Sequence, residues 1–112
     1  MKLITAYIKP YQLDNTREAL LNVGIRGMTA IEVRGFGRQL GHTELYRGAE
    51  YAVDFIPKIK LEIMCRDDQK DLIINTLIEI NKSNKIGAGK IRVSDIETLI
   101  RIRTGEMDED AL

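Results

Sequence analysis

Cysteine and histidine are almost absent from this sequence, which contains one of each, Cys65 and His42. With one cysteine no disulfide forms within the chain, and a structural zinc site built on several thiolates is excluded. With one histidine no metal site can use a pair of imidazoles, and a nucleophilic histidine would have to act from a glycine-rich loop. Cys65 falls on the apolar side of a predicted strand, which is typical of a small core residue. Nucleophilic and metal catalysis are therefore poorly supported.

A net charge and a long apolar run are also missing. The 17 Lys and Arg residues balance 17 Asp and Glu residues, whereas a general polyanion binder normally carries a basic excess. No apolar run has the length of a signal peptide's core or of a membrane-spanning helix, so a cytoplasmic setting is expected. With 112 residues and 44% hydrophobic content, the chain has about the size and composition of one globular domain.

Aromatic residues make up only 5% of the chain. RNA-binding domains built from β-α-β units stack bases on aromatic side chains of their central strands. The strand predicted over residues 58–65 contains no aromatic residue. Nucleic-acid recognition is therefore not expected.

What is present is a unit of strand, helix and strand. Residues 1–8 alternate as a strand does, and both faces are largely apolar, which places this strand inside a sheet. A helical stripe follows over 12–23, and Gly24 suits the position just past a helix. Residues 28–33 predict a second strand. The helical stripe consists of Leu13, Thr16, Leu20 and Val23.

A second unit of the same kind follows. Residues 58–65 alternate strictly, which predicts a half-buried strand. Asp67 or Asp68 is suited to cap the next helix, and short strands are predicted over 91–93 and 96–102. The inward side chains of the first strand are Ile59, Leu61, Ile63 and Cys65, and the helical stripe is Ile73, Ile74, Leu77, Ile78 and Ile80.

Two such units predict an α+β fold of the ferredoxin-like kind, a double βαβ (β-α-β-β-α-β) with both helices on one face of the sheet. In this prediction residues 1–112 form a single domain, and a long loop joins its halves. The topology hosts many unrelated functions, so the fold alone assigns none.

The joining loop, residues 35–54, has no regular hydrophobic period and contains four glycines. Loops of about twenty residues in a small domain are uncommon and usually functional or mobile. A disordered insertion is one interpretation. An interaction loop is the other, and it is favoured by Tyr46, Arg47 and Tyr51, because tyrosine and arginine often anchor protein–protein interfaces.

The run Gly87-Ala88-Gly89-Lys90 has the character of a phosphate-binding loop. Its glycines let backbone N–H groups point at an anion, and the lysine adds a positive charge. It is not a Walker A motif, because Asn84 stands in place of the first glycine and Ile91 in place of Ser or Thr. Judged alone, the segment fits a solvated turn equally well.

Arg101 and Arg103 add to the case for an anion site. On a strand, residues two apart project from the same face, and two guanidinium groups side by side suit a polyphosphate or a carboxylate. One interpretation is a ligand site shared with Gly87–Lys90. The other is a solvated charged face balanced by the acidic residues at the end of the chain, Glu106, Asp108, Glu109 and Asp110.

Five runs of the sequence resemble the PII nitrogen-regulatory signal-transduction proteins, nearly from end to end and at corresponding spacings. They are Gly35-Phe36-Gly37-Arg38-Gln39, Tyr46-Arg47-Gly48-Ala49-Glu50-Tyr51, Val53-Asp54-Phe55-Ile56-Pro57-Lys58, Lys85-Ile86-Gly87-Ala88-Gly89-Lys90-Ile91 and Arg101-Ile102-Arg103-Thr104-Gly105-Glu106. The resemblance implies a non-enzymatic regulator of nitrogen metabolism, assembled as a compact homotrimer with three ligand clefts between subunits.

The resemblance also implies the parts of each cleft, in which ATP and ADP compete. They include a protruding T-loop, about residues 37–55, a B-loop, about 82–90, and a C-terminal loop and tail, about 101–112. The residues implied to contact ATP or ADP are Thr29, Gly37, Arg38, Gln39, Met64, Gly87, Ala88, Gly89, Lys90, Arg101, Ile102 and Arg103.

In the family, 2-oxoglutarate binds beside Mg²⁺-ATP as a second effector. By the resemblance, Gln39 would contact the metal ion, and Gln39, Lys58 and Gly87 would hold 2-oxoglutarate. Lys58 would meet a carboxylate of that acid in a charge-assisted contact. Its role comes from the resemblance alone, because the strand pattern presents it only as an exposed lysine.

The T-loop carries the implied contacts with other proteins. Tyr51 matches a tyrosine that a uridylyltransferase modifies in many bacterial members, whereas Ala49 stands where some cyanobacterial members carry a phosphorylated serine. Tyr46, Arg47 and Tyr51 are the expected partner-binding residues, and Arg47 would enter a channel pore. Family targets include ammonia channels, glutamine synthetase adenylyltransferase, a nitrogen-sensing histidine kinase and N-acetylglutamate kinase. Contact with a membrane is expected only through a transporter partner.

Four sites depart from the family pattern. Leu40 replaces a common Lys, Ser83-Asn84 a common Thr-Gly, Ala88 an Asp, and Arg92 an aromatic residue. Without the Asp and with Arg92 this region is more positive. The phosphate cradle is expected to survive, because backbone N–H groups form it, while the nucleotide preference shifts.

Two other functions fit parts of the sequence. A ferredoxin-like enzyme that hydrolyses ATP or transfers a phosphoryl group would use Lys90, Arg101 and Arg103. A ligand-binding module would regulate one fixed metabolic enzyme. ATP binding without turnover separates the sensor from the enzyme, and several transient partners separate it from the module.

Overall fold

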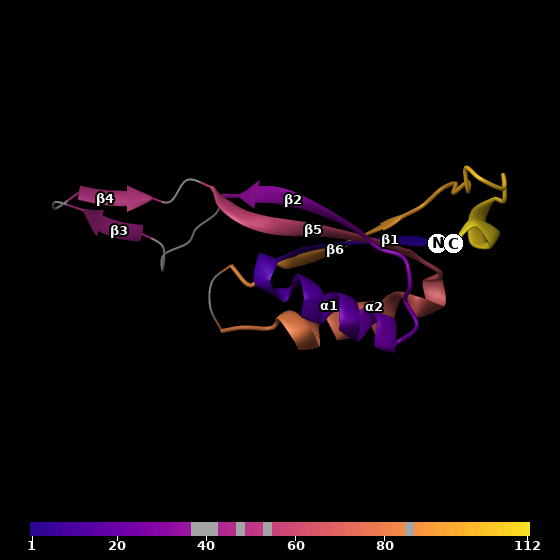
Figure 1. Ribbon diagram of the computed structural model, residues 1–112, viewed down its shortest axis with the longest axis horizontal. Coiled ribbons are helices and arrows are strands. Elements are labelled where there is room, and N and C mark those ends of the chain that lie inside the picture. The colour runs from indigo at the N-terminus through magenta and orange to yellow at the C-terminus, as the bar shows by residue number, and fades with distance from the viewer. Residues whose placement is uncertain (37–42, 47–48, 53–54, 85–86) are drawn as a thin grey trace.

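The computed structural model describes residues 1–36, 43–46, 49–52, 55–84 and 87–112, and for 43–46 and 49–52 it describes the backbone only. Two helices cover one face of the main sheet, and a separate hairpin extends from one end of it (Figure 1). The elements are β1 (Lys2–Ile8), α1 (Leu13–Asn22), β2 (Thr29–Gly35), β3 (Thr43–Tyr46), β4 (Ala49–Ala52), β5 (Ile56–Cys65), α2 (Lys70–Asn81) and β6 (Lys90–Asp95), with 3₁₀ turns at Pro10–Gln12, Asp67–Gln69 and Asp108–Ala111.

The main sheet has the strand order β2-β5-β1-β6, and each neighbouring pair is antiparallel. The first and second units therefore interleave, with β1 and β5 in the centre. This order, with both helices on one face (Figure 1), confirms the predicted ferredoxin-like fold and the interior position of β1.

The core lies between the sheet and the two helices. From β1 and β5 it takes alternate residues, as the period of a strand requires. The predicted helical stripes supply the other side, except that Ile78 is 48% exposed on the flank of α2. The buried core is Ile4, Ala6, Ile8, Leu20, Ile25, Ile59, Leu61, Ile63, Cys65, Ile73 and Leu77.

Helix α1 ends as its sequence predicts, whereas α2 does not begin as predicted. Gly24 has φ +88°, and the N–H groups of Gly24 and Ile25 donate to the carbonyls of Leu21 and Leu20, which is the Schellman arrangement. The predicted cap by Asp67 or Asp68 is wrong. A 3₁₀ turn precedes α2, and there the Gln69 side chain accepts the N–H of Arg66 at 3.0 Å.

The predicted strand over 96–102 is also wrong. Strand β6 ends at Asp95, and the chain then makes a turn in which only Ile100 and Met107 form an isolated bridge. The N–H of Arg101 donates to the carbonyl of Glu106 at 2.9 Å, and the N–H of Gly105, whose φ is +73°, donates to the carbonyl of Arg101 at 2.8 Å. The N–H and carbonyl of Arg101, which in a strand would pair with a neighbouring strand, thus form their hydrogen bonds within the turn.

The predicted long loop contains regular structure. Strands β3 and β4 pair as an antiparallel hairpin, from Thr43 opposite Ala52 to Tyr46 opposite Ala49. The hairpin stands away from the four-stranded sheet (Figure 1), so it needs no alternating apolar face to cover the core, and its strands leave no such signal in the sequence.

Candidate functional site

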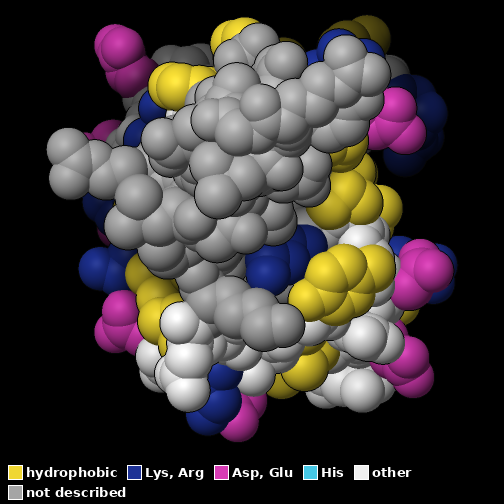
Figure 2. All heavy atoms as spheres, turned by 90° about the vertical axis from the view of Figure 1, so that its left-hand side faces the viewer, with side chains coloured by type: hydrophobic (Ala, Val, Ile, Leu, Met, Phe, Trp, Pro, Cys, Tyr) yellow, Lys and Arg dark blue, Asp and Glu magenta, His cyan; other side chains and the backbone are white. Residues whose placement is uncertain are grey.

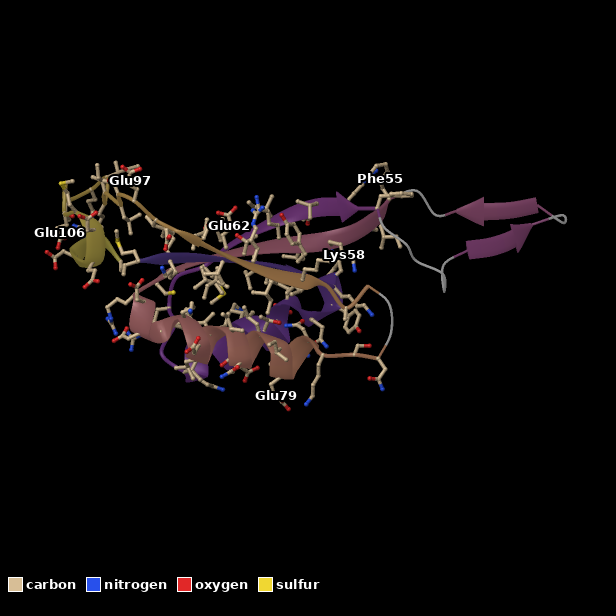
Figure 3. The ribbon with its side chains drawn as sticks, turned by 180° about the vertical axis from the view of Figure 1, so that it is seen from behind. Phe55, Lys58, Glu62, Glu79, Glu97 and Glu106 are labelled. Carbon is tan, nitrogen blue, oxygen red and sulfur yellow. The ribbon has the colours of Figure 1, made fainter. Side chains whose placement is uncertain are left out.

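Lys58 lies at the end of the sheet from which the hairpin extends (Figure 3). Its ammonium group donates to the main-chain carbonyl of Gly87, so the strand at 56–65 and the loop before β6 meet at this side chain. The pKa of Lys58 is lowered, first by burial and second by the nearby charge of Lys9. The expectation of an exposed lysine is therefore wrong. A partly dehydrated cation next to a second cation favours the approach of an anion.

Gly87 and Gly89 shape the loop around this lysine. Their φ angles are +92° and +110°, a region that side-chain-bearing residues rarely adopt. A β-carbon on Gly87 would lie 3.4 Å from the Lys58 ammonium nitrogen, and one on Gly89 would lie 1.8 Å from the carbonyl oxygen of Tyr7. Both positions thus require glycine for their backbone conformation, and Gly89 requires it also because of its close contact with β1. The predicted phosphate site at these glycines and Lys90 stays a prediction.

The cations of β6 face the side of the sheet that the helices leave open. Lys90 lies opposite Tyr7 and Arg92 opposite Thr5 in the pairing with β1, and Tyr7 lies opposite Lys60 in the pairing with β5. Among the residues that the structure describes, none forms an ion pair or a side-chain hydrogen bond with the side chain of Lys90 or Arg92. Seen from the hairpin end, basic and apolar side chains lie next to each other beside the residues drawn in grey (Figure 2).

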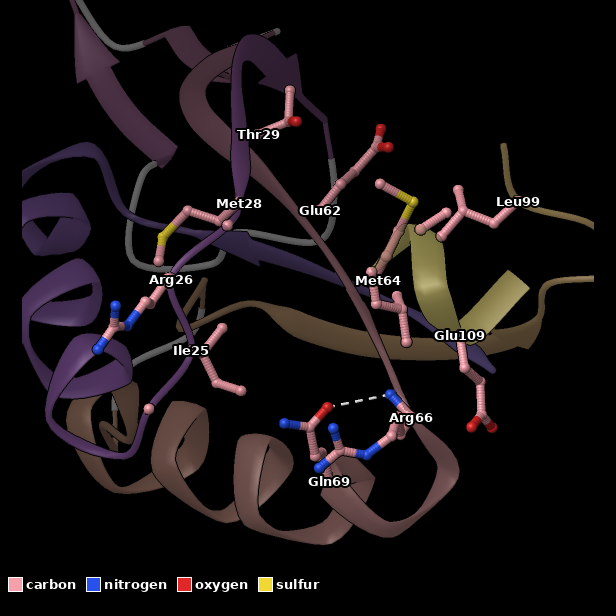
Figure 4. Close-up of a pocket in the computed structure, with 14 residues that line it drawn as sticks. Ile25, Arg26, Met28, Thr29, Glu62, Met64, Arg66, Gln69, Leu99 and Glu109 are labelled. Atoms are coloured by element: carbon pink, nitrogen blue, oxygen red, sulfur yellow. Dashed lines mark hydrogen bonds between the residues drawn. The ribbon is translucent and has the colours of Figure 1, made fainter. Parts of the chain in front are cut away.

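Thr29 and Met64 line a different cavity, of about 650 Å³ (Figure 4). Glu62 lies directly opposite Thr29 in the pairing of β2 with β5, and Leu99 and Glu109 from the chain's last segment complete the walls. No role for Glu62 was predicted from the sequence. Its position two residues before Met64, on the same face of the strand, is the feature that could have indicated that it lines the same cavity.

Arg101 and Arg103 do not lie on a common strand face, because residues 101–105 form a turn that is closed by the hydrogen bond from the Gly105 N–H to the Arg101 carbonyl. The Arg101 guanidinium donates to Glu106 and to main-chain oxygens of the last two residues, and Ile102 is fully exposed. Figure 3 shows Glu106 at the end of the molecule opposite Lys58. Within one chain, the two arginines and the Gly87–Lys90 loop are therefore not brought together, so a site shared by them stays a prediction for clefts between subunits.

Other predicted site residues lie outside the part that the structure describes. These are Gly37, Arg38, Gln39 and Arg47; His42, for which no functional role was expected, lies outside that part as well. For Tyr46 and Tyr51 the structure describes only the backbone: Tyr46 is the last residue of β3, and Tyr51 lies within β4. Their assigned roles stay predictions.

The two strands that lead into the hairpin are braced by a pair of phenyl rings. Phe36 follows β2 and Phe55 precedes β5, and their ring centres are 5.9 Å apart with the planes tilted by 51°. Both rings are exposed, at 64% and 60%. A tilted pair at this distance is favourable, so it holds the root of the hairpin next to Lys58.

Comparison with known proteins assigns the chain to a family. The profile described as "Nitrogen regulatory protein P-II" matches residues 1–106. The chain belongs to the P-II nitrogen regulatory protein family. It is 62% identical to "Nitrogen regulatory protein P-II" of Pasteurella multocida and 60% identical to that of Klebsiella oxytoca and to "Nitrogen regulatory protein P-II 1" of Escherichia coli K12, in each case over all 112 residues of both chains.

Membership in P-II confirms the resemblance and supports a nitrogen-regulatory signalling role that acts on target proteins and is consistent with effector binding. The regulatory names of the relatives also confirm that the chain is a regulator and not an enzyme. No helix in the described ranges is long and apolar enough to span a bilayer. Across the same ranges no three His, Cys, Asp or Glu side chains are grouped to hold a metal ion.

Proposed function

We propose that this P-II chain senses ATP, ADP and 2-oxoglutarate and controls target proteins through its T-loop. The contact of Lys58 with Gly87 carries the proposal. It joins a partly dehydrated ammonium group to a loop whose two glycines have positive φ, and glycine-rich turns of this kind can direct backbone N–H groups at an anion. A phosphate on the loop and a carboxylate on Lys58 would then be neighbours.

A homotrimer explains why the site residues lie in two groups. Lys58, which contacts Gly87, lies at the hairpin end of the main sheet, and Glu106, which accepts a hydrogen bond from Arg101, lies beyond the other end (Figure 3). If one end of a subunit meets the opposite end of the next, each cleft obtains both groups. In such a cleft the loop and the arginines would hold the phosphates, while Thr29 and Met64 would hold the base.

The ligands would bring charged groups into the cleft, and residues of the chain would bind them. Bound Mg²⁺-ATP brings a metal ion that Gln39 and the phosphates would hold, and 2-oxoglutarate would place a carboxylate against Lys58. The chain's own part is to present the cation, to exclude side chains at Gly87 and Gly89, and to carry both strands on into the T-loop.

The T-loop would report the bound ligand to partners. Each effector can shift the loop only by binding its conformations with different affinity, and coupling between two such sites is typically about 1–3 kcal/mol. Tyr51 would be the uridylylation site, and Tyr46 and Arg47 would contact targets such as an ammonia channel or glutamine synthetase adenylyltransferase.

Calorimetric titration tests the proposal. ATP with Mg²⁺ is titrated first into the protein alone and then in the presence of 2-oxoglutarate, and 2-oxoglutarate is titrated with and without Mg²⁺-ATP. Binding of 2-oxoglutarate only in the presence of Mg²⁺-ATP is the expected result. The absence of ATP binding contradicts the proposal, as does 2-oxoglutarate binding that ignores ATP.

A further inference from the structure

The side chain of Arg101 is held by one short segment of its own chain, residues 106–112, which we call the return segment. Nη1 of Arg101 donates to Oε1 of Glu106 at 3.2 Å. Nη2 donates to the main-chain oxygen of Leu112 at 3.0 Å and reaches that of Ala111 at 3.5 Å. All three acceptors thus come from the return segment.

The return segment is folded back by hydrogen bonds of its own. The N–H of Asp108 donates to the carbonyl of Leu99 at 2.6 Å, and the N–H of Leu99 donates to the Asp108 carboxylate at 3.3 Å. Asp108 has φ +55°, a left-handed conformation that has a free-energy cost for a residue with a side chain. These bonds offset that cost and place the acceptors in front of Arg101.

This arrangement engages the guanidinium nitrogen that both anion-binding forks share. A phosphate or carboxylate is bound bidentately by two neighbouring nitrogens, and both possible pairs, Nη1 with Nη2 and Nε with Nη2, include Nη2. Because Nη2 already donates to Leu112 and reaches Ala111, an anion that takes either fork has to compete with these oxygens for Nη2.

We propose that the return segment is an intramolecular competitor that occupies Arg101 until the anionic part of a nucleotide displaces it. The inference rests on the proposed function, in which Arg101 contacts nucleotide phosphates, and adds a step to it. The competitor is weak enough to be displaced, because the side chains of Arg101 and Glu106 are 37% and 45% exposed and exposed ion pairs are weak.

Electrostatic repulsion prevents the return segment and a polyphosphate from binding Arg101 at the same time. The return segment contains Glu106, Asp108, Glu109 and Asp110, so a bound polyphosphate repels it and does not share Arg101 with it. Arg103 has no ion-pair or hydrogen-bond partner in the described part of the chain. It is therefore available for the first contact with the ligand, before Arg101 is released.

Two matched variants test the competitor. Glu106→Gln removes one negative charge and weakens the hold on Arg101, whereas Asp110→Asn removes one negative charge from the same segment without a contact to Arg101. In titrations with Mg²⁺-ATP, the dissociation constant of Glu106→Gln is expected to be about two- to fivefold below that of Asp110→Asn, the size of an exposed ion pair. Equal constants, with ATP bound by the wild type, overturn the competitor but leave the proposed function intact.

A second measurement uses the unchanged protein. Hydrogen exchange at the amide of Asp108 is followed with and without saturating Mg²⁺-ATP. Faster exchange with ATP is expected, because displacement of the return segment opens the bond from this amide to the carbonyl of Leu99. Unchanged or slower exchange overturns the competitor. A wild-type protein that binds no ATP in either experiment overturns the proposed function together with it.

Discussion

Gly89 and Tyr7 are packed so closely that a β-carbon on Gly89 would lie 1.8 Å from the carbonyl oxygen of Tyr7. This contact fixes the second glycine of the candidate phosphate loop against the central strand β1. The loop therefore derives its position from the most buried strand of the sheet, and a change at Gly89 acts on the fold and on the ligand site together.

Gly89→Ala is expected to destabilise the protein and to weaken ATP binding. The matched control is Gly24→Ala, because Gly24 also has positive φ but nothing lies within 4 Å of its β-carbon position. Gly24→Ala costs about 1–2 kcal/mol of unfolding free energy through its conformation. Gly89→Ala adds the cost of a steric overlap, typically about 1–3 kcal/mol. Urea unfolding measures both, and equal destabilisation by the two variants contradicts the close contact.

Lys58 makes the stability depend on pH in the alkaline range. Its pKa is lowered by burial and by Lys9, so between the lowered pKa and the ordinary value of 10.5 the unfolded chain binds more protons than the folded chain. Stability due to this group therefore rises as pH rises through that window. Lys58→Met is expected to remove this rise, measured as the urea midpoint in steps from pH 7 to pH 10.

The control for this prediction is Lys60→Met, which removes a lysine from the same strand face two residues away. It is expected to keep the alkaline rise and the binding of 2-oxoglutarate. Lys58→Met is expected to lose 2-oxoglutarate binding while it still binds Mg²⁺-ATP. A pH profile that is the same in Lys58→Met and in the wild type argues against a dehydrated Lys58.

The sequence predicts the elements that cover the core better than those beyond it. Ile59, Leu61 and Ile63 alternate because one face of their strand packs on helices, and the structure buries all three. Ile100 and Ile102 alternate in the same way, yet they belong to a turn whose hydrogen bonds are local. The pattern alone does not show whether a neighbouring strand exists to pair with.

The site shows the same division. Gly87 and Gly89 could be predicted as loop residues from the sequence, because glycine is the residue typical of positive φ, and both have positive φ in the structure. The role of Lys58 is not predictable from its alternation, since its contact joins residues 29 positions apart in the chain. Likewise, the separation of Arg101 from the Gly87–Lys90 loop follows from the length of β6 and the turn after it, and a spacing of about a dozen residues does not reveal it.

The thiol of Cys65 is expected to react only when the protein opens. The residue is 1% exposed, and burial is the first cause that raises its pKa, so both access and the thiolate fraction are reduced. Labelling with an aromatic disulfide reagent should be slow in buffer and should accelerate with urea in step with unfolding. Fast labelling of the native protein contradicts the buried position.

Ala88→Asp is expected to shift the nucleotide preference from ATP towards ADP. Ala88 lies between the two glycines of positive φ and two residues before Lys90, so a carboxylate there would add a negative charge beside the proposed phosphate cradle. ATP carries one more negative charge than ADP and is repelled more. Ala88→Asn introduces nearly the same volume without the charge, so it separates electrostatics from size. Calorimetry of both variants with ATP and ADP measures the shift, and ATP and ADP affinities that Ala88→Asp leaves unchanged would show that the charge at this position does not set the preference.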